Sequence, residues 1–198
     1  MRIIARLDVK PPFVVKPVFF EGLRKVGNPK DLANKYYKEG ADEIFFIDIV
    51  SSLYRRSIDL NLVADVSNNI FVPFAVGGGI QTVEDAERII HSGADKIIIN
   101  TAAISNPTII EKIATKLGAQ SVVVHIQAKR WNDWYECYTE AGRNRSGREV
   151  LSWAREAEEC GAGELLLSVV DNDGAENGFD FHITEQLLNR VNIPVVVG

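Results

Sequence analysis

The chain has 198 residues, of which 46% are hydrophobic and 25% charged, a composition typical of one globular domain with a sizeable core. Its net charge of −5 argues against a nucleic-acid-binding protein, while leaving room for a local basic pocket that binds phosphate. The start, MRIIARLDV, is too short and too charged for a signal peptide, and no apolar run approaches the roughly 18 residues of a membrane span. We therefore expect a cytoplasmic protein. Cys137 and Cys160 lack metal-type spacing, which predicts two free thiols and no metal site.

Short, nearly continuous apolar runs alternate with helical patterns along the whole chain. Such runs are typical of parallel strands that are covered on both faces. Unbroken alternation of strand and helix indicates an α/β sheet or barrel. The predicted strands span residues 2–9, 43–50, 71–76, 96–100, 121–128, 164–170 and 193–197.

Capping residues mark the helix boundaries. Starts are predicted at Asn28-Pro29 and Asn106-Pro107, and capping boxes at Thr82 with Asp85 and at Ser146 with Glu149. Glycines that precede strands predict helix ends at Gly40, Gly93 and Gly161.

An internal repeat is the most informative feature of the sequence. GADEIFFID and GAGELLLSV begin at Gly40 and Gly161, an offset of 121 residues (161 − 40). Pro73 and Pro194 have the same offset (194 − 73). Two such halves predict a (β/α)8 barrel as a single domain over 1–198, with half-barrels at about 1–119 and 120–198. The second half stops where the first continues into GGI, so we expect the last β-α unit to be missing from the sequence shown.

Reactive groups of such barrels lie at the carboxyl ends of the strands. Asp8 ends the first predicted strand and is a candidate general acid or base, with a salt bridge to Lys10 or Lys16 as the structural alternative. Gln127 ends the fifth strand. Within the same strand, His125 is expected to be a packed core residue.

Two loops are candidates for binding phosphate. Gly77, Gly78 and Gly79 follow the third strand, and their backbone N–H groups can approach an anion. Asn100 and Thr101 end the neighbouring strand and add side-chain donors. A phosphate group is therefore expected there, and the repeat predicts a second such site, which suits a substrate with a phosphate at each end.

These motifs together resemble those of the HisF family, the cyclase subunits of imidazole glycerol phosphate synthase. The resemblance covers the whole chain. It rests on LDVK, VVK, GADE, FIDI, PFAVGGGI, GADKIIIN, GRNRSG, GAGE and DNDG. It implies a two-half (β/α)8 barrel without a cofactor, paired with a HisH-like glutaminase that releases ammonia. The ammonia crosses the barrel and reacts with a bis-phosphorylated ribulosyl aminoimidazole carboxamide.

The resemblance also implies roles for individual residues. Asp8 matches an acid/base aspartate, and Lys16 matches a lysine of the active-site loop. The loop glycines with Asn100 and Thr101 match one phosphate site, and Asp173 and Gly174 match part of the second. The family's ammonia gate, at the amino ends of the strands, is matched by Arg2, Glu43, Lys96 and Glu164. Asp95 matches a residue that faces the glutaminase.

The chain departs from the family at one important position. The family's second acid/base aspartate is Gln127 here, in HIQAKR instead of AIDAKR. Glutamine exchanges no proton near neutral pH, and losing one of two proton-transfer groups is expected to lower the rate on the order of 10²–10⁴-fold. His125 replaces an alanine, and PPFVVKP replaces an acidic-glycine turn after the first strand.

These departures keep other functions open. They resemble a WbuZ-like branch that supplies ammonia for amidating a sugar of surface polysaccharides. A second alternative is a barrel without catalysis that only activates the glutaminase. A third is the isomerase acting one step earlier in histidine synthesis, which needs carboxylates at both 8 and 127 and leaves the gate residues unexplained.

Overall fold

The structure is a computed structural model that describes residues 1–198, apart from the side chain of Glu21. The chain forms two compact units. The first unit contains residues 1–16 and 23–98, and the second contains residues 17–22 and 99–198.

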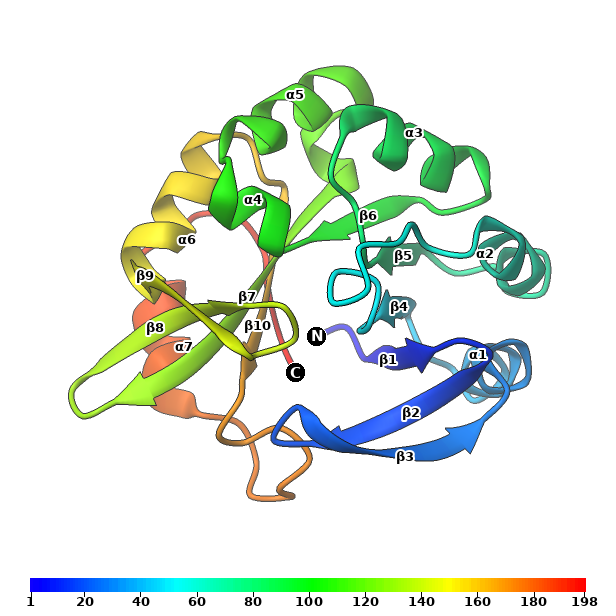
Figure 1. The fold of residues 1–198 in the computed structure, drawn as a ribbon, viewed down its shortest axis with the longest axis horizontal. Coiled ribbons are helices and arrows are strands. Elements are labelled where there is room, and N and C mark those ends of the chain that lie inside the picture. The colour runs from blue at the N-terminus through cyan, green and yellow to red at the C-terminus, as the bar shows by residue number, and fades with distance from the viewer. The chain divides into compact units, whose positions relative to one another are not determined.

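The first unit is built on parallel strands that alternate with helices along the chain. Helices α1, α2 and α3 lie along one side of its strands in Figure 1. The parallel strands, in spatial order, are β1 (Ile4–Lys10), β4 (Glu43–Asp48), β5 (Phe74–Gly77) and β6 (Lys96–Ile99). The helices are α1 (Pro29–Lys38), α2 (Leu60–Ser67) and α3 (Val83–His91). An antiparallel partner, β2 (Phe13–Val18), follows β1, and β3 (Glu21–Gly27) comes next.

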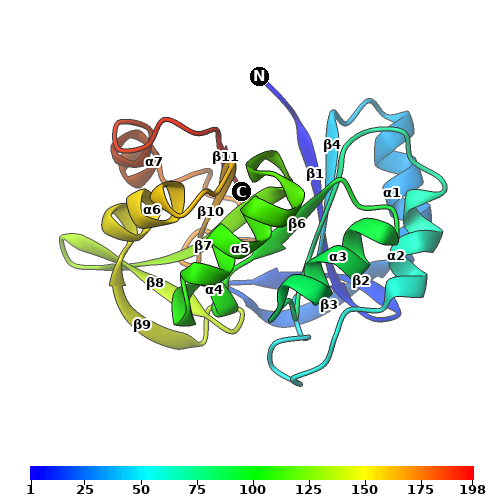
Figure 2. The same ribbon diagram turned by 90° about the horizontal axis from the view of Figure 1, so that it is seen from above.

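The second unit repeats this plan. It begins with α4 (Thr101–Ser105), α5 (Thr108–Leu117) and the short 3-10 helix η1 (Ala119–Ser121). Its parallel strands, in spatial order, are β7 (Val122–Trp131), β10 (Glu164–Val169) and β11 (Val195–Val197). An antiparallel hairpin, β8 (Trp134–Thr139) and β9 (Asn144–Glu149), follows β7. The remaining helices are α6 (Val150–Glu159) and α7 (Phe181–Leu188), which Figure 2 shows from a second side.

The sequence repeat is therefore a structural repeat. Each half of the sequence runs through a strand, an antiparallel partner strand, a third strand, a helix, a parallel strand, a helix and a further parallel strand. Corresponding elements keep the offset of 121 residues: α1 and α6 begin at Pro29 and Val150, and β4 and β10 begin at Glu43 and Glu164. The predicted α/β fold class, a β-α barrel architecture with two half-barrel repeats, is confirmed.

All seven predicted strands are present, and the strands inside the core carry the buried apolar side chains that identified them, whereas β11 is half-buried. Every residue of β4 is buried, and so is every residue of β10. In the first unit the rings of Phe46 and Phe74 pack edge to face with centroids 6.0 Å apart. In the second, Trp153 on α6 is 1% exposed. Among the residues described, no helix is long and apolar enough to cross a membrane.

The two hairpins are not predicted by the sequence. Pro11 and Pro12 directly precede β2 and Pro17 lies within it, and proline within a run argues against a strand. The second hairpin is held by a buried carboxylate: Glu136 on β8 accepts hydrogen bonds from Arg145 Nε and from the backbone N–H of Gly147, both at 2.8 Å. Polar pairing of this kind between neighbouring strands leaves no periodic hydrophobic pattern in the sequence.

The helix caps are only partly as predicted. Asn28 caps α1, and Thr82 with Asp85 forms a capping box at α3. The prediction for Ser146 is wrong, because Ser146 lies in β9 and the carboxylate of Glu149 caps α6 instead. The prediction for Asn106 is also wrong: its side chain accepts a hydrogen bond from Thr108 Oγ1 and caps no backbone N–H of α5. Gly40, Gly93 and Gly161 follow helix ends with positive φ, as predicted.

Both cysteines are free, as predicted. Cys137 is fully buried in β8. Burial raises the pKa of the Cys137 thiol, with a further rise from Glu149. The thiol is therefore a neutral packing group and a poor nucleophile at neutral pH.

The second hairpin is also tied to α7 by a tyrosine. The Tyr135 hydroxyl donates a hydrogen bond of 2.6 Å to Asp180, the N-cap residue of α7. Burial, together with this bond, raises the pKa of Tyr135 from 10.0 to about 12. The bond therefore depends on the protonated phenol.

This pKa predicts that stability falls between about pH 10 and pH 12. Over that range the unfolded chain loses the Tyr135 proton while the folded chain keeps it, so rising pH favours unfolding. Tyr135→Phe should lower the free energy of unfolding at pH 8 and make its decline above pH 10 shallower. Urea unfolding at pH 8, 10 and 11 measures both. Tyr54→Phe, at an exposed tyrosine, is the control, and an equal change in slope for both variants would contradict the prediction.

Candidate active site

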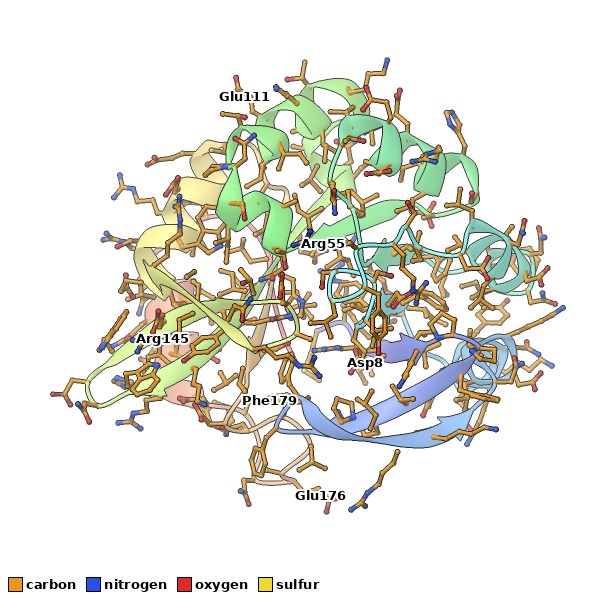
Figure 3. The ribbon with its side chains drawn as sticks, in the orientation of Figure 1. Asp8, Arg55, Glu111, Arg145, Glu176 and Phe179 are labelled. Carbon is orange, nitrogen blue, oxygen red and sulfur yellow. The ribbon has the colours of Figure 1, made fainter. Side chains whose placement is uncertain are left out.

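Asp8 lies near the carboxyl end of β1 and is 3% exposed (Figure 3). Its Oδ1 accepts a hydrogen bond of 2.8 Å from Arg6 Nε. The ion pair considered as the structural alternative for Asp8 is thus formed with Arg6. Residues two apart on a strand share a face, so Arg6 reaches Asp8 directly. Lys16 lies on the neighbouring strand β2 with an exposed side chain.

The glycine loop of the first unit is shaped by close backbone contacts. Gly78 and Gly79 have positive φ values of 115° and 69°. A Cβ on Gly78 would lie 2.4 Å from the carbonyl oxygen of Asp48, and one on Gly79 equally close to that of Arg56. Asp48 in turn binds Arg56 at 2.8 Å. A small pocket opens beside Gly78 and Gly79. The close backbone contacts give both glycines a packing reason in addition to their predicted role with phosphate.

In the second unit, Asn100 and Thr101 make their side-chain hydrogen bonds within the protein. Asn100 Nδ2 donates to the carbonyl oxygens of His125 at 2.9 Å and Tyr138 at 3.1 Å. Thr101 Oγ1 donates to Asn100 Oδ1 and accepts from the backbone N–H of Glu140. These hydrogen bonds connect the start of α4 to β7 and to the end of β8. The phosphate-binding role of Asn100 and Thr101 stays a prediction.

Gln127 lies on β7 opposite Ser168 of β10 and is 7% exposed. Its Oε1 accepts a hydrogen bond of 2.8 Å from the backbone N–H of Gly142, in the turn between β8 and β9. Gly142 has a φ of 75°, and a Cβ there would contact Phe20 and Val170 at 3.3 Å. Gln127 therefore fixes the turn of the hairpin.

The loop after β10 carries Asp173 and Gly174. Asp173 is 8% exposed, and its carbonyl oxygen accepts a hydrogen bond of 2.8 Å from the backbone N–H of Phe19. Gly174 has a φ of 68°, and a Cβ on it would lie 2.5 Å from the carbonyl oxygen of Pro17. The segment 17–22 is therefore packed on this loop within the second unit.

The predicted gate residues of the first unit are in direct contact. Glu43, at the start of β4, is 1% exposed and pairs with Arg2 at 2.8 Å and with Lys96 at 2.7 Å. Asp95 precedes Lys96 and accepts a hydrogen bond from the backbone N–H of Phe74. Glu164 starts β10 of the second unit and is 3% exposed.

Comparison with known proteins gives one consistent result. A family model described as "Histidine biosynthesis protein" matches residues 2–198. The chain is 50% identical to the imidazole glycerol phosphate synthase subunit HisF of Pyrococcus furiosus, over all of this chain and 78% of that protein. It is 48% identical to the HisF subunit of Legionella pneumophila, over all of this chain and 94% of that protein. The HisF subunit of Myxococcus xanthus is 45% identical over all of this chain and 78% of its own length.

These similarities and the half-barrel repeats define a β-α barrel of a biosynthetic synthase. The chain belongs to the HisF family of histidine biosynthesis proteins. HisF chains are the cyclase subunits of imidazole glycerol phosphate synthase, so the resemblance found in the motifs is confirmed.

The geometry of Glu43 predicts a large energetic effect. Glu43→Gln keeps the side-chain shape but removes the buried negative charge that pairs with Arg2 and with Lys96. Breaking a buried ion pair in this way costs about 3–5 kcal/mol. Urea unfolding should therefore show a loss of this size in the free energy of unfolding.

The control for Glu43 is Glu39→Gln on the same unit. Glu39 pairs with Lys35 at 3.9 Å, and both side chains are more than half exposed. Pairs of this kind contribute about 0–1 kcal/mol. Equal losses for the two variants would show that the Glu43 pairs contribute no more than a surface salt bridge.

Proposed function

We propose that this chain acts in the cytoplasm as the cyclase subunit of imidazole glycerol phosphate synthase. It takes ammonia from a HisH-like glutaminase and uses it to form imidazole glycerol phosphate from a bis-phosphorylated ribulosyl aminoimidazole carboxamide. The observation that carries the proposal is the identity of 45–50% with the HisF subunits named above over the full chain. Those relatives give no support to a sugar-amidating branch or to a non-catalytic activator.

Asp8 is the proposed acid/base group for the reaction. Forming an imidazole ring from ammonia and a ketone takes several proton transfers, and a positioned carboxylate can carry one of them. Asp8 is 3% exposed and fixed by Arg6, so its carboxylate has a defined orientation. Lys16 is proposed to act beside it, from the strand that follows.

The substrate phosphates are assigned to loops at the carboxyl ends of strands. One site is proposed at Gly77, Gly78, Gly79, Asn100 and Thr101, and the second at Asp173 and Gly174. Positive φ values at Gly78, Gly79 and Gly174 support the assignment, since turns of this kind can point successive N–H groups at an anion.

Ammonia entry is assigned to the buried charges at the amino ends of the strands. Burying a carboxylate with cations is costly unless the charges are well paired. Arg2 and Lys96 both contact Glu43 there, which supports the proposal that the three form a gate together with Glu164. Asp95 is proposed to face the glutaminase.

The proposed role of Asp8 is tested by Asp8→Asn. The amide preserves size but carries no proton, so ammonium-driven cyclase turnover should fall on the order of 10²–10⁴-fold. Turnover is measured as formation of imidazole glycerol phosphate with saturating ammonium, which removes the need for the glutaminase. Circular dichroism and thermal unfolding should show that the variant remains folded.

Asp65→Asn is the matched control, since Asp65 has an exposed side chain on α2. Its turnover should equal that of the wild type. Full turnover of Asp8→Asn would remove Asp8 from the mechanism. Absence of turnover in the wild type with ammonium would contradict the proposed function itself.

A further inference from the structure

A histidine and a serine form a buried pair in the second unit. His125 Nε2 lies 3.0 Å from Ser168 Oγ, within hydrogen-bond distance. His125 is 2% exposed and Ser168 is fully buried. The two side chains come from neighbouring parallel strands, β7 and β10, and the predicted roles of the site use neither of them.

The register of these strands places the pair on the face that carries Gln127. His125 and Gln127 are two residues apart on β7 and therefore share a face. Ser168 lies directly opposite Gln127, and Leu166 lies opposite His125. The His125 ring thus reaches one step toward the carboxyl end of the sheet to meet the Ser168 hydroxyl.

Glu164 belongs to the same face at the amino end, opposite Val123. From the amino to the carboxyl end this face carries Glu164, then His125, then Ser168 beside Gln127. A titratable ring therefore lies between the residue proposed to admit ammonia and the position where the family has its second acid/base aspartate.

We propose that the His125–Ser168 pair performs the proton transfer that Gln127 cannot perform. This inference rests on the proposed cyclase function and extends it. Imidazole is the side chain whose ordinary pKa is closest to neutral pH, so it can both accept and return a proton. A hydroxyl that is hydrogen-bonded to an imidazole nitrogen can pass its proton to that nitrogen.

The proposed proton transfer has two stages. As the C–N bond forms, the π electrons of the ketone move to its oxygen, and the nitrogen gives one proton to Ser168 Oγ while the Ser168 proton passes to His125 Nε2. The imidazolium then returns its proton through Ser168 to the oxygen, which leaves a hydroxyl group and an amine on the same carbon. The pair ends in its starting state, and no oxidant, reductant or further reactant is consumed.

The backbone of His125 is fixed by a side-chain hydrogen bond. Asn100 Nδ2 donates to its carbonyl oxygen at 2.9 Å and to that of Tyr138 at 3.1 Å. Gln127 is fixed separately, through Gly142 at 2.8 Å. In this proposal His125 acts through Ser168 and is a positioning residue, whereas Ser168 is the group that exchanges the proton with the substrate.

The test is ammonium-driven turnover of His125→Gln, which can still hydrogen-bond Ser168 but exchanges no proton. We expect kcat to fall on the order of 100-fold, with KM for the phosphorylated substrate changed less than about threefold. Ser168→Ala should lower kcat in the same direction with the fold intact. His182→Gln, on an exposed face of α7, is the matched control and should match the wild type.

A rescue experiment separates proton transfer from packing. Gln127→Asp introduced into His125→Gln restores an acid/base group on the same face, so kcat should recover at least tenfold. A double variant no faster than His125→Gln alone would overturn the inference, as would wild-type kcat in both His125→Gln and Ser168→Ala. These outcomes all presuppose an active wild type, whose inactivity would overturn the cyclase function and this inference with it.

Discussion

The burial of both faces of the parallel strands is the constraint on which the rest of the structure depends. Every residue of β4 and β10 is buried, so a polar side chain within a strand must find its partner inside the protein. Asp8 finds Arg6, Glu43 finds Arg2 and Lys96, and Gln127 finds the backbone of Gly142. The polar residues of the candidate site are thus held in place, because burial keeps away the water that could otherwise replace their protein partners.

The internal repeat explains how one plan gives two different polar faces. Both halves keep the same order of elements, and from the first helix of each half onward the elements keep an offset of 121 residues. Asp8 of β1 corresponds to Gln127 of β7, and these carry different chemistry. In the second unit the imidazole of His125 and the hydroxyl of Ser168 stand where a carboxylate would be expected to work, so the repeat preserves the scaffold while the proton-transfer group changes.

Much of the fold could be predicted because strand burial and capping are local properties. Apolar runs identified all seven parallel strands, and Asn28 and Thr82 marked true helix starts. The hairpins escaped prediction because their strands contain charged residues, glycines and Pro17 and depend on partners such as Glu136 with Arg145. Ser146 failed as a cap because the strand β9 continues through it to Glu149.

The sequence by itself determined the class of fold, the repeat, the family and the identity of the candidate residues, since each rests on spacing or motif. The tertiary structure alone decided which of these residues touch. Only strand register could place Ser168 opposite Gln127 and bring its hydroxyl to His125, 43 residues away. The sequence suggested a packed core histidine, and the structure adds its partner, because hydrogen bonds between strands follow from pairing geometry and leave no mark in either strand alone.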